Sequence, residues 1–355
     1  MDWQMNRQRI SQWREDVFAR LADMRSDSRP SVWLAATALA VYLVLAIVLG
    51  MFWSVAPDGF GVNENAAVRA ETHGQGVAVG TVTTAALIEV ASTMLDKKGG
   101  FVSNDILPPG LWLDNITNWE YGVLIQVRDL TRALRESFSR SQSQSQEDSD
   151  LGKAEPRLNF SNNSWAVPAS ESEYRDGIAY IDSYMQRLGD SANSQSQFYA
   201  RADNLNYWLV IVEGRLGSLS QRLSASVGKR RLNTDLAGDA AAQQSTRGPV
   251  EVEVKTPWSE IDDVFYESRG TAWALIHFLR AVEIDFADVL KKKNATVSLR
   301  QIIRELEGTQ QMVFSPMILN GSGFGLMANH SLVMASYISR ANAAIIDLRN
   351  LLMDG

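Results

Sequence analysis

The chain has 355 residues, of which 34 are basic and 41 acidic, so its formal net charge at neutral pH is −7. This acidic balance argues against nucleic acid as a partner and against a polybasic lipid-binding face. Because the chain contains no cysteine, no disulfide bond can stabilise it, and packing alone must hold its fold together.

Residues 1–30 are predicted to form a cytoplasmic amphipathic helix. Trp3, Ile10 and Trp13 begin a series of apolar residues at helical spacing, and arginines occupy the other faces. Such a helix can lie among lipid headgroups or pair with a partner helix. It is too short to be a signalling output domain.

Residues 31–53 (SVWLAATALAVYLVLAIVLGMFW) carry no charge and predict a single transmembrane helix. At about 1.5 Å per residue, this run matches a bilayer core of about 30 Å. Trp33 and Trp53 stand near its ends, where indole rings favour the headgroup region. A cleaved signal peptide is the alternative, but the run is long for one, and Pro57 follows the small residues that cleavage requires.

Basic residues predict the orientation of this span. Six arginines precede it, whereas the 20 residues after it contain only Arg69. The side richer in Lys and Arg stays in the cytoplasm, so the N-terminus is expected there and the remainder of the chain outside. Residues 54–77, with four glycines and few apolar residues, are expected to form a flexible tether.

The exported part is predicted to be all-α, in two helical parts (78–228 and 257–355) joined by a linker (229–256). Apolar residues alternate at spacings of four and three over 198–223 and 261–289, which is typical of long, heptad-patterned helices of the coiled-coil kind. Shorter helices are predicted over 82–98, 120–140, 171–188, 299–307 and 329–353. Only residues 250–254 alternate as a strand does, which allows a short edge strand at most.

Two helix, loop, helix units, 82–138 and 299–353, align with each other when one gap is allowed. The alignment places Leu87 over Leu299 and Ile106 over Ile318. It predicts a duplicated unit. The alternative is a chance match between two amphipathic helix pairs with glycine-rich loops.

The loops inside these two units are the candidate functional surfaces. Both are long and rich in apolar residues. A long apolar loop either folds back on the end of the bundle or is exposed for binding. The candidate partner-binding residues are Phe101, Ile106, Trp112, Phe314, Ile318 and Phe324.

Catalytic chemistry finds little support, and no catalytic residue, metal site or cofactor is expected. The three histidines are far apart, and His277 is expected to be a packed helix residue. Carboxylates near the first loop, such as Glu120, could form an acid/base pair acting on glycans. Their spacing is unspecific, which favours helix capping or solvation instead.

Several strings resemble a proteobacterial inner-membrane family described as a domain of unknown function. They are KKGGFVSNDILPPG, QVRDLTRALR, SRSQSQSQEDSDL, QFYARADNL, RLGSLSQRLSASVG and NHSLVMASYISRANAAIIDLR. The resemblance covers about residues 78–355. It implies a Gram-negative inner membrane and a periplasmic bundle, but no activity and no catalytic residue.

The sequence therefore favours a non-enzymatic, membrane-anchored periplasmic module that binds or scaffolds other envelope proteins, with the lipid bilayer as a further partner. One alternative is a sensor that binds a periplasmic ligand between its helices and signals through a partner at residues 1–30. Another is a cell-wall hydrolase. The oligomeric state is left open.

Overall fold

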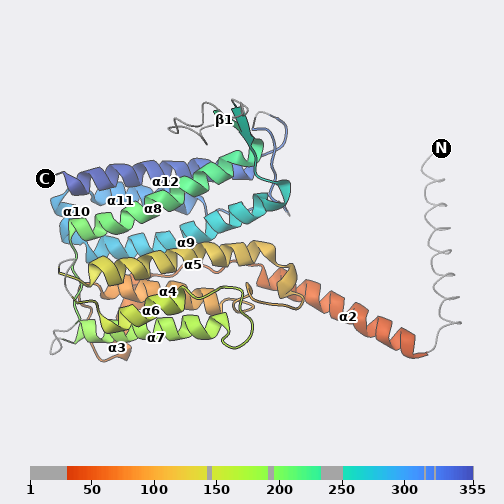
Figure 1. Cartoon of the computed structure of the whole chain (residues 1–355), viewed down its shortest axis with the longest axis horizontal. Helices are drawn as coiled ribbons and strands as arrows, with labels where there is room; N and C mark the ends of the chain where they lie inside the picture. The colour runs from red at the N-terminus through yellow and green to blue at the C-terminus, as the bar shows by residue number, and fades with distance from the viewer. Residues whose placement is uncertain are drawn as a thin grey trace, which may run out of the picture. The chain divides into compact units, whose positions relative to one another are not determined.

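The computed structural model in Figure 1 describes residues 30–141, 146–190, 196–232, 251–315, 317–323 and 325–354. The helix predicted over residues 1–30 therefore lies outside the described residues, apart from Pro30. Contacts within the chain define two units, Met1–Phe52 and Trp53–Gly355, which we describe separately.

The described part of the first unit belongs to helix α2 (Pro30–Trp53), whose last residue already belongs to the second unit. Its residues Ser31–Trp53 are long and apolar enough to cross a membrane, and only 6% of the most apolar window is buried within the protein. Trp33 lies in the first turn of this helix, and Trp53 ends it.

The predicted tether, residues 54–77, is instead folded onto the bundle. Helix α3 (Val62–Thr72) lies within it and packs its apolar face against the helix that follows. Ahead of α3, the backbone N–H of Phe60 donates to Nε2 of His277 (3.1 Å), and the two rings stack with centroids 4.2 Å apart. The tether prediction was wrong because it weighed the glycines and overlooked small apolar residues at a spacing of four.

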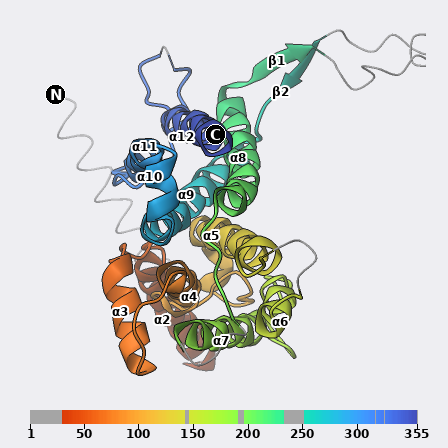
Figure 2. The same cartoon turned by 90° about the vertical axis from the view of Figure 1, so that its left-hand side faces the viewer.

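The second unit is a helical bundle in two groups, which Figure 2 shows one above the other. The first group contains α3 together with α4 (Thr81–Asp96), α5 (Asp114–Ala133), α6 (Ser149–Leu158) and α7 (Ser170–Gly189). The second group contains α8 (Ala202–Ser224), α9 (Ile261–Asp285), α10 (Ala287–Lys292), α11 (Thr296–Gly308) and α12 (His330–Met353). The described residues are thus mainly helical, and the all-α prediction is confirmed.

Helices α5 and α9 join the two groups by unusually close packing. A Cβ atom on Gly270 would lie 2.0 Å from the carbonyl oxygen of Trp119, and one on Gly122 would lie 2.1 Å from that of Glu267. Only glycine allows two helix backbones to approach this closely. The predicted parts meet along this contact, so they share one hydrophobic core and form a single compact unit.

The helix directions place the connecting loops at two opposite ends of the bundle. Asn118 in the first turns of α5 donates to Asp263 in the first turn of α9 (2.7 Å). Phe138, just beyond α5, packs against Phe286, just beyond α9, with ring centroids 5.3 Å apart. The two helices are therefore parallel, and the loops that follow α4 and α11 lie at the end where α5 and α9 begin (Figure 1).

Helix α8 confirms the apolar face that the heptad pattern predicted. Leu209 and Leu216 are completely buried. The helix nevertheless has only 23 residues and α9 only 25, shorter than the patterns suggested. In α9 the pattern continues past the helix end because Phe286 is buried in the break between α9 and α10.

A two-stranded antiparallel sheet occupies both ends of the predicted linker, 229–256. Strand β1 (Lys229–Leu232) pairs with β2 (Glu251–Val254), and Lys229 lies opposite Val254. The sequence indicated β2 but not β1, because Lys-Arg-Arg-Leu shows no alternation of apolar residues. Residues 233–250 lie outside the described part of the chain.

Candidate functional site

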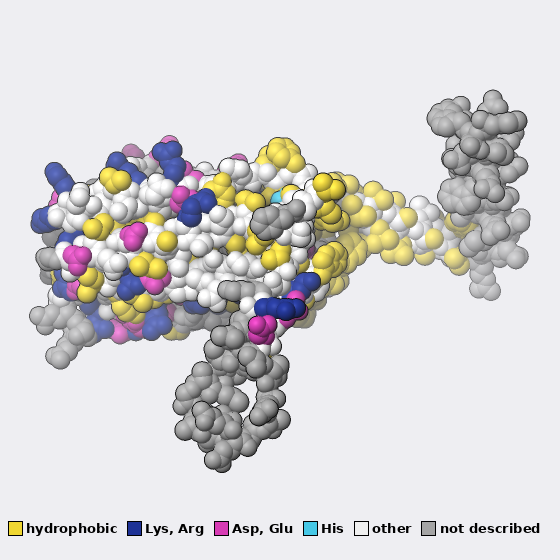
Figure 3. Space-filling model, turned by 90° about the horizontal axis from the view of Figure 1, so that it is seen from above, with side chains coloured by type: hydrophobic (Ala, Val, Ile, Leu, Met, Phe, Trp, Pro, Cys, Tyr) yellow, Lys and Arg dark blue, Asp and Glu magenta, His cyan; other side chains and the backbone are white. Residues whose placement is uncertain are grey.

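Exposed apolar side chains gather at the end of the bundle where α5 and α9 begin, which we call the apolar end. Figure 3 shows many hydrophobic side chains toward one end of the bundle and many charged ones toward the other. The apolar loop surface is defined by Ile106, Leu107, Leu111 and Trp112 of the first loop (97–113), Trp165 and Val167 before α7, Trp258 before α9, and Met312, Phe314, Met317, Leu326 and Met327 of the second loop (309–329).

Three segments of the apolar end carry almost no charge, whereas strands β1 and β2 and residues 255–260 at the same end do carry charged residues. The second loop and residues 159–169 contain no charged residue, and Asp105 alone is charged between residues 99 and 113. Burial, together with repulsion from Glu171, raises the pKa of the Asp105 carboxyl. A surface that is both apolar and uncharged is a candidate binding surface.

Three of the predicted candidate residues belong to this surface. Phe314 is 90% exposed, whereas Trp112 and Ile106 are each 50% exposed. The side chains of Trp112 and Phe314 come from different loops that the fold brings to the same end of the bundle (Figure 1).

Phe101 and Ile318 do not contribute to it. Phe101 is buried and meets the ring of Tyr174 edge-on, with centroids 5.6 Å apart. Ile318 is partly buried against the core, and Phe324 lies outside the described residues. Phe101 and Ile318 differ from their neighbours because part of each loop folds back on the bundle while the rest is exposed.

Sequence reasoning missed Trp165, Trp258 and Leu326. They are 61%, 81% and 108% exposed, respectively. The signal that could have found the first is its position in an uncharged segment next to Pro168. Trp258 follows Pro257 and lies in a short 3₁₀ turn (Trp258–Glu260) ahead of α9, outside the apolar pattern that begins at Ile261.

A buried ion pair fixes the first loop. Nζ of Lys97 lies 2.6 Å from Oε1 of Glu120, and neither side chain is exposed. Glu120 also accepts hydrogen bonds of 2.9 Å from the backbone N–H groups of Val102 and Ser103. Burial raises the pKa of Glu120, against the effect of the Lys97 ammonium and these donors. The expectation of capping or solvation for Glu120 was wrong, because the loop folds back over α5.

The chain enters the second unit at Trp53, beside both loops. A Cβ atom on Gly99 of the first loop, whose φ is +88°, would lie 2.6 Å from Cγ of Trp53. Residues 54–59 line a cavity together with Met312 and Val313 of the second loop. The segment that follows α2 therefore starts at the apolar end.

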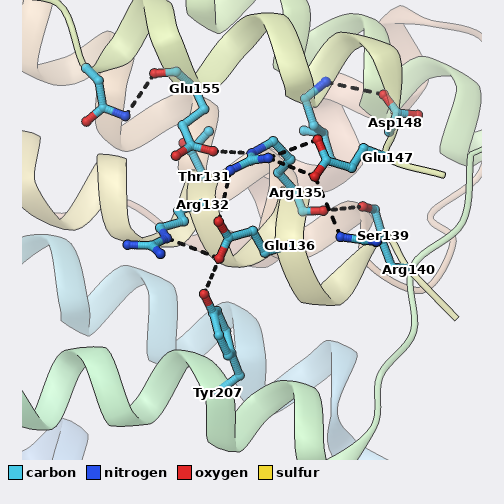
Figure 4. A network of polar contacts seen from close by, with 12 residues as sticks. Thr131, Arg132, Arg135, Glu136, Ser139, Arg140, Glu147, Asp148, Glu155 and Tyr207 are labelled. Atoms are coloured by element: carbon cyan, nitrogen blue, oxygen red, sulfur yellow. Dashed lines mark hydrogen bonds and ion pairs between the residues drawn. The ribbon is translucent and has the colours of Figure 1, made fainter. Parts of the chain in front are cut away.

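Charged side chains form a network at the opposite end, which we call the polar end (Figure 4). Arg135 donates to Glu136 and to Glu147, with nitrogen–oxygen distances of 2.9 Å. Burial raises the pKa of Glu136, but hydrogen bonds from Tyr207 and Arg132 outweigh it and hold that pKa below its usual range. The charged side chains of this network are partly exposed to solvent.

A groove lies between α5, α8 and α9. Its volume is about 380 Å³, and Tyr121, Gln126, Val210 and Thr271 are among the residues that line it. Gln126 is completely buried, yet neither Nε2 nor Oε1 of its amide has a hydrogen-bond partner within the protein. A buried amide without partners is costly, so this position is a candidate for a polar ligand.

Among the titratable groups, His277 has a structural position. In the described ranges, no group of three or more His, Asp or Glu side chains is placed to hold a metal ion. Nδ1–H of buried His277 donates to the carbonyl of Trp273 (2.8 Å), and Nε2 accepts from Phe60. Burial lowers the pKa of His277 to about 4, so this histidine is neutral, and its predicted packed position is confirmed.

Comparison with known proteins gives one match. A family model described as an uncharacterized protein conserved in bacteria (DUF2333) matches residues 26–355. No curated protein and no solved structure matches the chain. Because the match spans α2 and the whole bundle, and agrees with the resemblance found in the sequence, the chain belongs to the bacterial family DUF2333.

Proposed function

We propose that this chain is a non-catalytic binding module of the bacterial cell envelope. Helix α2 anchors it in the inner membrane, and the bundle of residues 53–355 lies in the periplasm, where it binds or scaffolds other envelope components. The length and apolar character of α2 support the anchor. The arginines that precede α2 support the orientation.

The apolar loop surface carries this proposal. It exposes three tryptophans and a phenylalanine, and all of these except Trp258 lie in segments that carry almost no charge. Single exposed apolar residues are ordinary, but a group of large ones at one end of a molecule marks a place of interaction. Aromatic side chains of this kind often provide most of the energy of a binding surface.

Photo-crosslinking in cells tests the proposal. A photoreactive amino acid replaces Trp112 or Phe314 in the full chain, and the matched control replaces Val297 of α11, which is 76% exposed and lies at the polar end. We expect both loop positions, but not the control, to give adducts with a protein or a lipid. Equal labelling at all three positions, or none, would overturn the proposal.

Reporter fusions test the orientation separately. A reporter that is active only outside the cytoplasm should give signal when it is fused after Gly355 and none when it is fused before Met1. The opposite pattern would reverse the topology and exclude a periplasmic bundle.

A second candidate function is a periplasmic sensor, which the groove with Gln126 favours. Its unpartnered amide fits a small molecule with its own amide or carboxylic acid group. Gln126→Leu removes the buried polar group, so it should stabilise the free protein and abolish such binding. Native mass spectrometry of the purified chain should show a bound molecule that this variant loses; a ligand-free wild-type chain would speak against the sensor.

A further inference from the structure

From Trp53 onward, the chain is held against the bundle. Trp53 already packs beside Gly99, and Phe60 is held by its hydrogen bond to His277 and by ring stacking. If α2 spans the membrane, as proposed above, the part of the bundle around Trp53 lies next to the bilayer surface. Both long loops adjoin this part, because Gly99 belongs to one and Met312 and Val313 to the other.

The residue types at this end suit the lipid headgroup layer. Trp112, Trp165 and Trp258 each combine a large apolar ring with an N–H group, and such side chains concentrate at membrane interfaces. The flexible and aromatic side chains of Met312, Phe314 and Leu326 can enter the acyl boundary. Charged residues, which would resist burial in lipid, are absent from the second loop.

The polar end does not share this concentration of exposed apolar and aromatic residues. Lys291, Lys292 and Lys293 follow one another at this end, which also carries the network around Arg135. An overall tendency to expose apolar residues would have affected both ends. A soluble protein partner at the apolar end would have to fit between the bundle and the membrane to which Trp53 is tied.

We infer that the apolar loop surface is inserted into the headgroup layer of the bilayer's periplasmic leaflet, so that the bundle stands on the membrane with its polar end outward. This inference rests on the proposed anchoring and binding function and names the lipid bilayer as the component bound by the two loops. The rest of the bundle surface, including the groove at Gln126, then faces the periplasm.

Fluorescence quenching in nanodiscs tests the inference. The chain has no cysteine, so Phe314→Cys and Leu326→Cys each give one site for an environment-sensitive dye, and Val297→Cys gives the matched control. The full-length variants are reconstituted in phosphatidylethanolamine and phosphatidylglycerol, with and without lipids that carry a quencher near the headgroup. Because the three native side chains are exposed, the substitutions leave the core intact.

We expect the dyes at 314 and 326 to be quenched by the labelled lipids and several-fold less accessible to iodide than the dye at 297. Equal iodide accessibility at all three positions would overturn the inference. If the loops are then crosslinked to a protein in cells, the proposed binding function stands with a protein partner. If they are crosslinked to nothing, both proposals fail.

Discussion

The two ends of the bundle are covered by different kinds of side chain. At the polar end, partly exposed charges such as Arg135, Glu136 and Glu147 connect the ends of helices through hydrogen bonds. At the apolar end, the two long loops carry almost no exposed charge, and the ion pair between Lys97 and Glu120 is buried. The difference shows that the chain can cover an end of the bundle with charged side chains, and it is the reason for our proposal that the apolar end contacts something other than water.

Removing one carboxylate from each end of the bundle should change the free energy of unfolding by very different amounts. Glu120→Ala leaves the Lys97 ammonium buried and unpaired, which should cost about 3–5 kcal/mol. Glu147→Ala, whose side chain is 42% exposed, should cost less than about 1 kcal/mol. Thermal unfolding of the full chain in detergent, followed by circular dichroism, measures both; similar costs would mean that the pair at the apolar end is not sealed from solvent.

Two substitutions in α8 test which residues belong to the hydrophobic core between the two ends. Leu209→Ala should destabilise the bundle by about 2–5 kcal/mol, whereas Val210→Ala, on the exposed face of the same helix, should cost less than about 1 kcal/mol. Arg215 of the same helix would not be an equally neutral control. The structure pairs it with the largely buried Asp129 at 2.8 and 3.1 Å, so its removal should cost more than that of an ordinary surface residue.

A pH dependence should follow from His277, which pins the segment after α2 to the bundle. Burial, which outweighs the hydrogen bond to Trp273, lowers its pKa from 6.5 to about 4. Between these values the unfolded chain takes up a proton that the folded chain does not, so stability should fall by up to about 3 kcal/mol as the pH drops from 6.5 to 4.

His277→Gln separates this effect from the titration of carboxylates. Glutamine keeps one donor and one acceptor but does not titrate in this range. The stability difference between wild type and variant should therefore shrink, and can reverse, as the pH falls toward 4. A difference that is constant with pH would show that His277 is not buried as a neutral ring.

The smallest effect is expected at the apolar loop surface itself. Trp112→Ala should change the free energy of unfolding by less than about 1 kcal/mol, because half of the side chain is exposed and its role is outside the core. The matched control is Trp119→Ala, which empties a completely buried site and should cost about 3–5 kcal/mol. Loss of the fold in the Trp112 variant would assign that side chain to packing instead of binding.

Sequence periodicity predicted what depends on local contacts. The faces of α8 and α12 follow from apolar residues at spacings of three and four, and Leu209 and Ile345 are buried as that spacing requires. The approach of α5 to α9 could not be predicted, because Gly122 and Gly270 lie 148 positions apart in the sequence and nothing local links them. The burial of Glu120 likewise depends on a loop that returns over its own helix.

The candidate site could be predicted only in part, because local sequence patterns do not determine its tertiary contacts. An uncharged, apolar loop indicates an unusual surface, which led to Trp112 and Phe314. Which side chains of such a loop turn inward depends on tertiary contacts, as with Phe101 on Tyr174. The duplicated unit remains a prediction: superposition of α4 and α5 on α11 and α12 should place Ile106 over Ile318.

The distance of each end of the bundle from the bilayer shows whether the apolar end faces the membrane. Helix α9, with 25 residues, is about 37 Å long, so dyes at the two ends of the bundle report clearly different heights. Energy transfer to acceptor lipids in nanodiscs should be much stronger from a dye at Leu326→Cys than from one at Lys292→Cys. Equal transfer would mean that the bundle lies flat on the membrane. Stronger transfer from position 292 would mean that the polar end faces the membrane. Either result would contradict the inference that the apolar loop surface is inserted in the headgroup layer.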